Sequence, residues 1–153
     1  MIFLFSKRFF EKLKNYNVLL ASGSKRRHEL LNQLGVKFKI VNQDVEESFS
    51  NDLRCSEITD YLAKKKSSLL VEKLKKNDLL ISSDTIVWHK NRALGKPKNR
   101  DEAFEMIKSL ENSSHEVITS ICISTIKSQV IVNEKTLVFF DKIDKNDLLY
   151  YTK

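Results

Sequence analysis

The chain has 153 residues, enough for one domain with a buried core, and 41% of its residues are hydrophobic. Its 27 basic and 20 acidic residues give a net charge of +7, which attracts nucleic acid, acidic membranes or small polyphosphates without choosing among them. The sequence has no apolar run long enough to span a bilayer, and its two cysteines lack metal-ligand spacing. We therefore expect a cytoplasmic protein that neither enters a membrane nor holds zinc.

Residues 1–16 are expected to form an N-terminal extension to a domain over residues 17–153. The first ten residues are apolar and then basic, which reverses the order of a secretory signal. We predict instead a short amphipathic helix over residues 6–16 that packs on the domain or on a partner.

Residues 18–31 run from an apolar strand into the basic first turn of a helix. Free backbone N–H groups at a helix start attract anions, and Ser22 and Ser24 add hydroxyl donors. Arg26 and Arg27 add forked donors that suit phosphate oxygens. The segment therefore predicts an anion site, although a capped surface helix with a solvated basic face is the simpler interpretation of such a motif taken alone.

The helix that begins in this segment is expected to have Ser24 as its N-cap, to bury Leu30, Leu31 and Leu34, and to end at Gly35. Alternating apolar residues over 36–40 then predict a half-buried strand that leads to the acidic segment 44–48.

Residues 56–75 show the longest helical pattern, with Ser56 or Thr59 as its cap. The apolar face is expected to contain Ile58, Tyr61, Leu62, Leu69, Leu70 and Leu74. Lys66 lies four residues from both Leu62 and Leu70 and so falls on that face. It either turns its ammonium out to water or meets an anion.

Asp84 is the best single candidate for chemistry, because it interrupts the apolar strand predicted over residues 79–88. A buried carboxylate needs a cation, a metal or several hydrogen bonds. The alternative is a structural aspartate that caps a neighbouring turn.

The loop 94–97 holds Lys96 between Gly95 and Pro97 as a positioned cation. Asn99 is then expected to open a helix that reaches Leu110. Residues 117–125, 129–133 and 136–140 are predicted to form three short strands of an antiparallel meander, and a helical turn is expected near Asp144.

The ordered motifs from residue 17 to residue 151 resemble those of the Maf-type nucleoside triphosphate pyrophosphatases. They are Leu20-Ala21-Ser22-Gly23-Ser24-x-Arg26-Arg27-x-Glu29-Leu30-Leu31, Asp44-x-Glu46-Glu47-Ser48, Leu62-Ala63-x-x-Lys66, Ser83-Asp84-Thr85-Ile86-Val87, Gly95-Lys96-Pro97 and His115-x-Val117-x-Thr119. Each motif is weak alone, but their order and spacing together are specific.

The resemblance implies an α/β fold with a mixed twisted sheet, flanking helices and two lobes around a nucleotide cleft. It also implies hydrolysis of a nucleoside triphosphate to the monophosphate and pyrophosphate with a divalent cation, Mg²⁺ or Mn²⁺. Asp84 would accept a proton from the attacking water or contact the metal, and Glu47 would help to hold the metal. The implied phosphate ligands are Ser22, Ser24, Arg27, Lys66 and Lys96.

Arg26 and Thr85 resemble the family branch that acts on dTTP and UTP, in which they would help to select the base. Lys25 stands where the family usually has proline, which adds a cation to the loop. Family members also continue past the end of this match, so we expect the shortened chain to expose apolar sheet surface that a homodimer would cover.

Two other functions remain as hypotheses. A shortened family member that binds nucleotide or a protein partner without catalysis is the first alternative. A nucleic-acid binder is the weakest hypothesis, because only the net charge and scattered lysines support it and no binding motif accompanies them.

Overall fold

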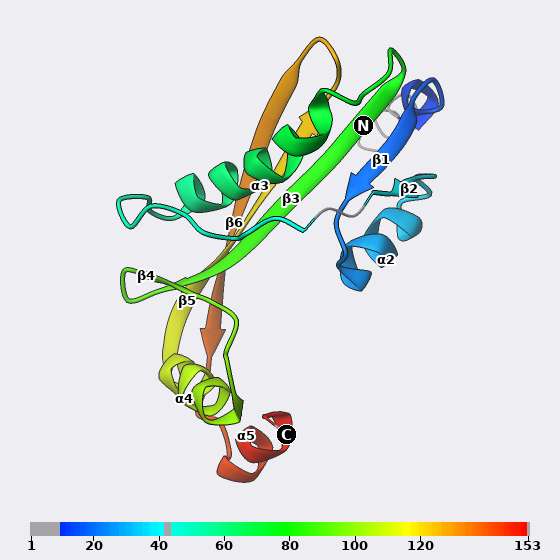
Figure 1. The fold of residues 1–153 in the computed structure, drawn as a ribbon. Coiled ribbons are helices and arrows are strands. Elements are labelled where there is room, and N and C mark those ends of the chain that lie inside the picture. Colours follow the sequence, from blue (N-terminus) through cyan, green and yellow to red (C-terminus); the bar gives the residue numbers. More distant parts are fainter. Residues whose placement is uncertain (1–9, 42–43, 153) are drawn as a thin grey trace.

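The computed structural model describes residues 10–41 and 44–152, which form a mixed sheet with flanking helices (Figure 1). The strands are β1 (Asn17–Ala21), β2 (Lys39–Ile40), β3 (Asp78–His89), β4 (Arg92–Leu94), β5 (Ser113–Ser124) and β6 (Gln129–Phe140). The helices are α2 (Lys25–Gln33), α3 (Ser56–Val71), α4 (Arg100–Leu110) and α5 (Lys145–Tyr151). The predicted α/β class is confirmed.

The strand order is β2-β1-β3-β5-β6, with β4 paired to β3. β1 is parallel to both β2 and β3, whereas β3, β5 and β6 form an antiparallel meander. The three long strands connect a part of the molecule that carries α2 and α3 with an end that carries α4 and α5 (Figure 1). In the part of the chain that the structure describes, no helix has the length and apolar character to cross a bilayer.

The main apolar core lies between α3 and the sheet. Ile58 and Leu62 of α3 pack with Ile86 of β3 and Ile118 of β5, and all four are buried. The i, i+4 spacing of the two helix residues places them on one face, and alternation along the strands brings the other two to the same side of the sheet.

A row of buried hydroxyl groups continues this interface along α3. Thr59 Oγ1 lies 2.5 Å from Ser120 Oγ, and Ser67 Oγ lies 2.6 Å from Ser124 Oγ. All four residues are fully buried. Because a buried hydroxyl group without a partner costs about 1–3 kcal/mol, these contacts favour one position of α3 on the sheet.

The prediction that α2 buries its leucines is wrong. Leu30 is 50% exposed, Leu34 is 58% exposed, and α2 contains no buried residue. The helix lies beside β1 and β2 at the sheet edge (Figure 1). Since β2 has only two residues, it offers little sheet surface for the helix to cover.

The bounds and the buried face of α3 also differ from the prediction. The helix ends at Val71 rather than at residue 75, and its N-cap is Cys55 rather than Ser56 or Thr59. Tyr61 and Leu69 are exposed, because hydroxyl and small side chains occupy much of the face that meets the sheet.

The two strands predicted over residues 129–140 are one continuous strand, β6. The polar residues that suggested a turn instead have partners on neighbouring elements. Asn133 Nδ2 donates to both carboxylate oxygens of Asp60 at 3.1 Å, and Lys135 Nζ lies 2.9 Å from Glu116 Oε1. β6 therefore pairs with β5 along all of its length.

Several local signals gave the correct elements. The strands at residues 18–21 and 79–88 are confirmed as β1 and β3. The side chains of Asn99 and Asp144 cap α4 and α5 by accepting backbone N–H bonds. The helix predicted over residues 6–16 lies partly outside the described residues. Within its described part, residues 10–13 are helical.

Truncating the core should destabilise the fold strongly. We expect Ile118→Ala to lower the free energy of unfolding by about 2–5 kcal/mol, because it removes buried methyl groups and leaves a cavity. Urea denaturation followed by circular dichroism measures this change. Ile126→Ala is the matched control, since Ile126 is 46% exposed and its truncation should cost less than about 1 kcal/mol. Equal losses in the two variants would contradict this assignment of the core.

Candidate functional site

A free edge of β3 creates the main cleft. The pairing of β1 with β3 ends at Ala21 and Ser82, and the pairing of β4 with β3 starts at Leu94 and Val87. Residues 83–86 of β3 therefore have no strand beside them on that edge in the described chain. A cleft of about 1050 Å³ opens there, at the carboxyl end of the parallel strand β1. Open α/β sheets bind ligands at such ends.

The cleft brings together nearly all the predicted site residues. Its lining includes Ser22, Ser24, Arg27, Glu47, Lys66, Asp84, Thr85 and Lys96. Arg26 is the exception, because it is exposed and does not line the cleft. Its expected part in base selection stays a prediction without geometric support.

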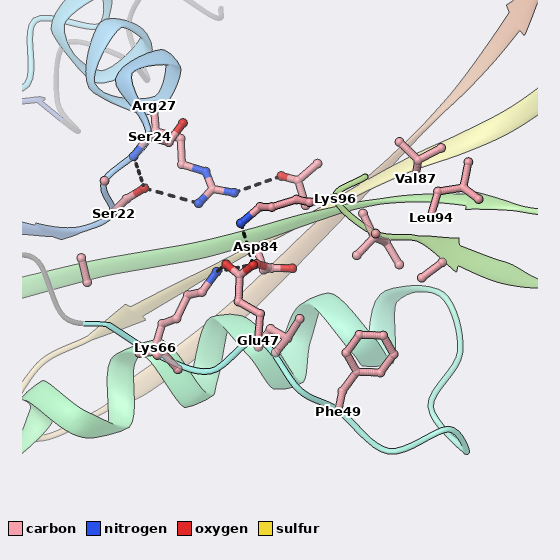
Figure 2. A pocket seen from close by; sticks show the side chains of 18 of the residues that line it. Ser22, Ser24, Arg27, Glu47, Phe49, Lys66, Asp84, Val87, Leu94 and Lys96 are labelled. Atoms are coloured by element: carbon pink, nitrogen blue, oxygen red, sulfur yellow. Dashed lines mark hydrogen bonds and ion pairs between the residues drawn. The ribbon is translucent and has the colours of Figure 1, made fainter. Parts of the chain in front are cut away.

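Lys66 joins two carboxylates from separate parts of the chain. Its Nζ lies 2.5 Å from Asp84 Oδ1 and 2.9 Å from Glu47 Oε1. Lys96 Nζ contacts the other oxygen of Glu47 at 2.8 Å. Figure 2 shows the two lysines approaching Glu47 from different sides, with Asp84 next to them. We call these four residues the charged cluster.

The pair of Lys66 and Asp84 is the part of the charged cluster most shielded from water. Their side chains are only 13% and 9% exposed. Lys66 lies on the face of α3 that meets the sheet, and Asp84 lies on β3 opposite it. The anion that an inward lysine requires is thus present. Burying two charges costs several kcal/mol per ion, so such a pair adds little to the stability of the fold. A buried charged pair beside a cleft is instead typical of a functional site.

Glu47 is held in place by a segment fixed to α3. Lys65 Nζ donates to both the backbone carbonyl and the hydroxyl group of Ser48, each at 3.2 Å.

The two lysines of the charged cluster change the pKa of Glu47. The hydrogen bond from Lys96, followed by the one from Lys66, lowers this pKa from 4.5 to about 2. In return, Glu47 raises the pKa of Lys96. The Lys96 side chain is 86% exposed, so water screens its contact with Glu47.

Arg27 occupies the free edge of β3. Its guanidinium donates to the backbone carbonyl of Ser83 at 2.9 Å, to Thr85 Oγ1 at 3.3 Å and to Ser22 Oγ at 3.4 Å. Burial lowers the pKa of Arg27, and the charges of Asp84 and Glu47 oppose that shift. The arginine therefore both closes part of the sheet edge and adds a cation to the cleft.

The loop before α2 is ordered by its own polar groups. Ser22 Oγ accepts the backbone N–H of Ser24 at 3.2 Å, and His28 Nε2 lies 2.7 Å from the carbonyl oxygen of Ser22. Ser24 is the N-cap as predicted, but its side chain makes no capping bond. Within the first turn, the N–H of Arg27 already donates to the carbonyl of Ser24 at 3.1 Å. Ser22, Ser24 and Arg27 line the cleft, so an anion there would meet the serine hydroxyl groups and the guanidinium of Arg27. His28 was missed because a single histidine in a helix carries no distinctive pattern.

An apolar wall borders the charged cluster and was not predicted from the sequence. It consists of Phe49, Leu62, Ile86, Val87, Ala93 and Leu94. Figure 2 shows Phe49, Val87 and Leu94 away from the lysines and carboxylates. Its members come from four separate segments, so no local pattern announces it. A ligand with an anionic end and a less polar ring would match both parts of the cleft.

Three carboxylates line the cleft, those of Asp44, Glu47 and Asp84. The described residues contain no group of three or more His, Cys, Asp and Glu side chains that would enclose one. Glu47 and Asp84 nevertheless converge on a single ammonium group. Mg²⁺ is commonly held by one or two carboxylates together with water and substrate phosphates, so this donor set fits a metal that arrives with a nucleotide.

Comparisons with known proteins give consistent results. A family model described as Maf-like protein matches residues 17–153. A dTTP/UTP pyrophosphatase of Flavobacterium johnsoniae is 47% identical over 141 residues, which cover 92% of this chain and 73% of that protein. The protein of the same name from Flavobacterium psychrophilum is 45% identical, with 92% and 72% covered. Among solved structures, the Ham1 protein of Staphylococcus aureus has a TM-score of 0.54 at 15% identity, covering 79% of this chain and 70% of that one, and thus shares the fold.

The charged cluster makes a testable prediction about pH. Because the pKa of Glu47 is lowered to about 2, its ion pairs stabilise the fold fully above about pH 4.5 and lose this contribution as the pH falls toward 2. We expect Lys96→Met to raise the pKa of Glu47 toward 4.5, since the Lys96 hydrogen bond is the largest cause of the shift. Carboxyl ¹³C NMR titration measures this pKa.

Lys98→Met is the matched control, because Lys98 belongs to the same loop but does not line the cleft. It should leave the Glu47 pKa unchanged. The ion-pair assignment would be wrong if both variants shifted this pKa equally or if neither shifted it.

Proposed function

Because the chain belongs to the Maf family, we propose that it hydrolyses nucleoside triphosphates to the monophosphate and pyrophosphate. Relatives carry the name dTTP/UTP pyrophosphatase, so dTTP and UTP are the proposed substrates. The observation that carries the proposal is the buried ion pair of Lys66 and Asp84 in a cleft that Arg27 and Lys96 also line.

The cations of the cleft suit a triphosphate. Arg27 of α2 lines the cleft together with Lys66 and Lys96 of the charged cluster. With no substrate present, the two carboxylates neutralise these lysines. We infer that the phosphate oxygens take over the ammonium groups when a nucleotide binds, which frees Glu47 and Asp84 for other contacts.

The proposed reaction is attack by water on the α-phosphorus. A new phosphorus–oxygen bond forms, the bond from the α-phosphorus to the α–β bridging oxygen breaks, and pyrophosphate leaves with that bonding pair. Asp84 takes the proton of the water if it acts as the base. The alternative given by the resemblance is that Asp84 contacts the metal. In both cases its buried position on β3 and its contact with Lys66 would hold the carboxylate in place.

Glu47 and Asp84 are the proposed ligands of Mg²⁺ or Mn²⁺. The metal would neutralise phosphate charge, as it does in other enzymes that cleave polyphosphates. Glu47 sits at the outer part of the cleft, where its side chain is 42% exposed, so it can change partner at little desolvation cost.

Thr85 is the residue of the cleft that we propose for base selection. Its hydroxyl lies 3.3 Å from a guanidinium nitrogen of Arg27 and 3.0 Å from Thr119 Oγ1. These contacts fix the hydroxyl at the free edge of β3.

We also propose that the protein is cytoplasmic and forms a homodimer. These proposals are supported by the two free cysteines and by exposed apolar residues on β6, namely Val130, Val132, Leu137 and Phe139.

Removing the buried carboxylate tests the proposed chemistry. The wild-type chain with Mg²⁺ should release pyrophosphate from dTTP and UTP faster than from GTP. Asp84→Asn should lower this rate at least about 100-fold, because an amide accepts no proton from water. A coupled pyrophosphate assay measures the rates, and circular dichroism confirms that the variant folds.

Asp141→Asn serves as the control for Asp84, since Asp141 is exposed and outside the cleft. It should retain turnover within about twofold. Unchanged turnover in Asp84→Asn would exclude the role given to Asp84. Nucleotide binding by the wild type without any pyrophosphate release would favour the non-catalytic alternative.

The metal proposal predicts a specific effect of Glu47→Gln. Loss of one carboxylate ligand should raise the Mg²⁺ concentration for half-maximal activity by about tenfold or more. Removal of the metal with EDTA should stop the wild-type reaction, and added Mg²⁺ should restore it. Glu46→Gln is the control, because Glu46 is exposed and does not line the cleft. An equal metal requirement in both variants would overturn the assignment of Glu47.

A further inference from the structure

A second pocket lies at the end of the sheet where β1 and β3 begin. It has a volume of about 500 Å³ and is formed by three segments that are far apart in the sequence. These are the residues before β1, the turn between α3 and β3, and the turn between β5 and β6. Figure 1 shows the three segments at one end of the long strands, away from the gap beside β3 that opens into the main cleft.

The pocket is lined by cations and neutral polar groups. Lys12, Lys76 and Lys127 come from the three different segments, and none of the described residues that line the pocket is acidic. Asn15, Asn77 and Thr125 add neutral hydrogen-bonding groups, while Tyr16 and Ile126 add an apolar surface. Tyr16 is 41% exposed and Ile126 is 46% exposed, so both are open to a ligand.

The acidic residues next to these segments already have partners. Glu11 Oε1 lies 2.7 Å from Lys14 Nζ. Asp78 is buried, and its carboxylate accepts the backbone N–H of Lys75 at 2.9 Å and the side-chain amide of Asn17 at 3.2 Å. Within the described chain, none of the three pocket lysines forms a salt bridge. Three lysines from separate segments thus line one pocket, and none of them is paired with an acidic side chain of the described chain.

The backbone around the pocket is fixed by hydrogen bonds. Thr125 Oγ1 accepts the N–H groups of Lys127 and Ser128 at 3.2 and 3.1 Å, which closes the turn between β5 and β6. The N–H of Asn17 donates to the carbonyl of Asn77 at 2.8 Å, which joins the other two segments. Because these contacts fix the backbone of the segments that carry the lysines, anion binding would order the lysine side chains but not the backbone.

We propose that this pocket is a second binding site, separate from the main cleft, for a small phosphate-bearing anion. Ammonium groups from three segments bind the phosphate oxygens, as lysines commonly do. The pocket is large enough for a mononucleotide, and the Tyr16 ring offers a surface for its base. The same chemistry serves two sources of phosphate, inorganic pyrophosphate and a nucleoside monophosphate.

NMR titration of the full chain tests this proposal independently of any hydrolysis. The methyl groups of Ile126 and the ring of Tyr16 report on the pocket itself. At about 150 mM salt, where exposed charges are largely screened beyond about 8 Å, we expect saturable shifts with pyrophosphate and with dTMP. Thymidine, which has no phosphate, should cause none. If dTMP binds more tightly than pyrophosphate and Tyr16→Leu removes this difference, the ligand is a nucleotide. If both anions bind with equal affinity, the pocket recognises only the phosphate group.

A triple variant tests the three lysines directly. It carries Lys12→Ala, Lys76→Ala and Lys127→Ala, and its affinity for pyrophosphate and for dTMP should fall at least about tenfold. The control is a second triple variant that carries Lys37→Ala, Lys98→Ala and Lys142→Ala. It removes the same charge from exposed positions outside both pockets, so its affinity for the two anions should stay within about twofold of the wild type. The site does not exist if the reporters show no saturable shift or if the two triple variants weaken binding equally.

Discussion

The buried ion pair of Lys66 and Asp84 is the contact on which the site depends. It joins α3 to the middle of β3 at a point where both side chains are almost completely shielded from water. Taking two charges out of water costs several kcal/mol per ion, and only close pairing offsets that cost. The pair therefore fixes both the rotation of α3 and the position of the carboxylate. The hydroxyl contacts of Thr59 and Ser67 with the sheet act in the same direction.

The cleft exists because two strands beside β3 are short. β1 stops at Ala21, and β4 pairs with β3 only from Val87 onward. No strand of the described chain covers the edge between them, and the Arg27 guanidinium donates to one of its carbonyl groups, that of Ser83. The helix start, the segment that carries Glu47 and the loop that carries Lys96 all meet at this gap. Charged side chains and an apolar surface thus border the same cleft, which is the arrangement that a nucleotide requires.

Local signals account for the predictions that proved correct. The caps of α4 and α5, the strand that contains Asp84 and the inward position of Lys66 each follow from residues close together in the sequence. The errors arose where burial depends on distant segments. Leu30 and Leu34 have helical spacing, but no described element covers them. A break was expected in β6 at polar residues whose partners, Asp60 and Glu116, lie on other elements.

The sequence by itself determined the class of fold, the family and the residue types of the site, because ordered motifs and hydrophobic periodicity are properties of the chain alone. The tertiary structure decided how these residues are paired. It placed Glu47 between Lys66 and Lys96, turned Arg27 toward the edge of β3 and left Arg26 outside the cleft. It also gathered three lysines around a second pocket. The physical reason is that distances between charges depend on chain segments that meet only after folding, and no local pattern encodes them.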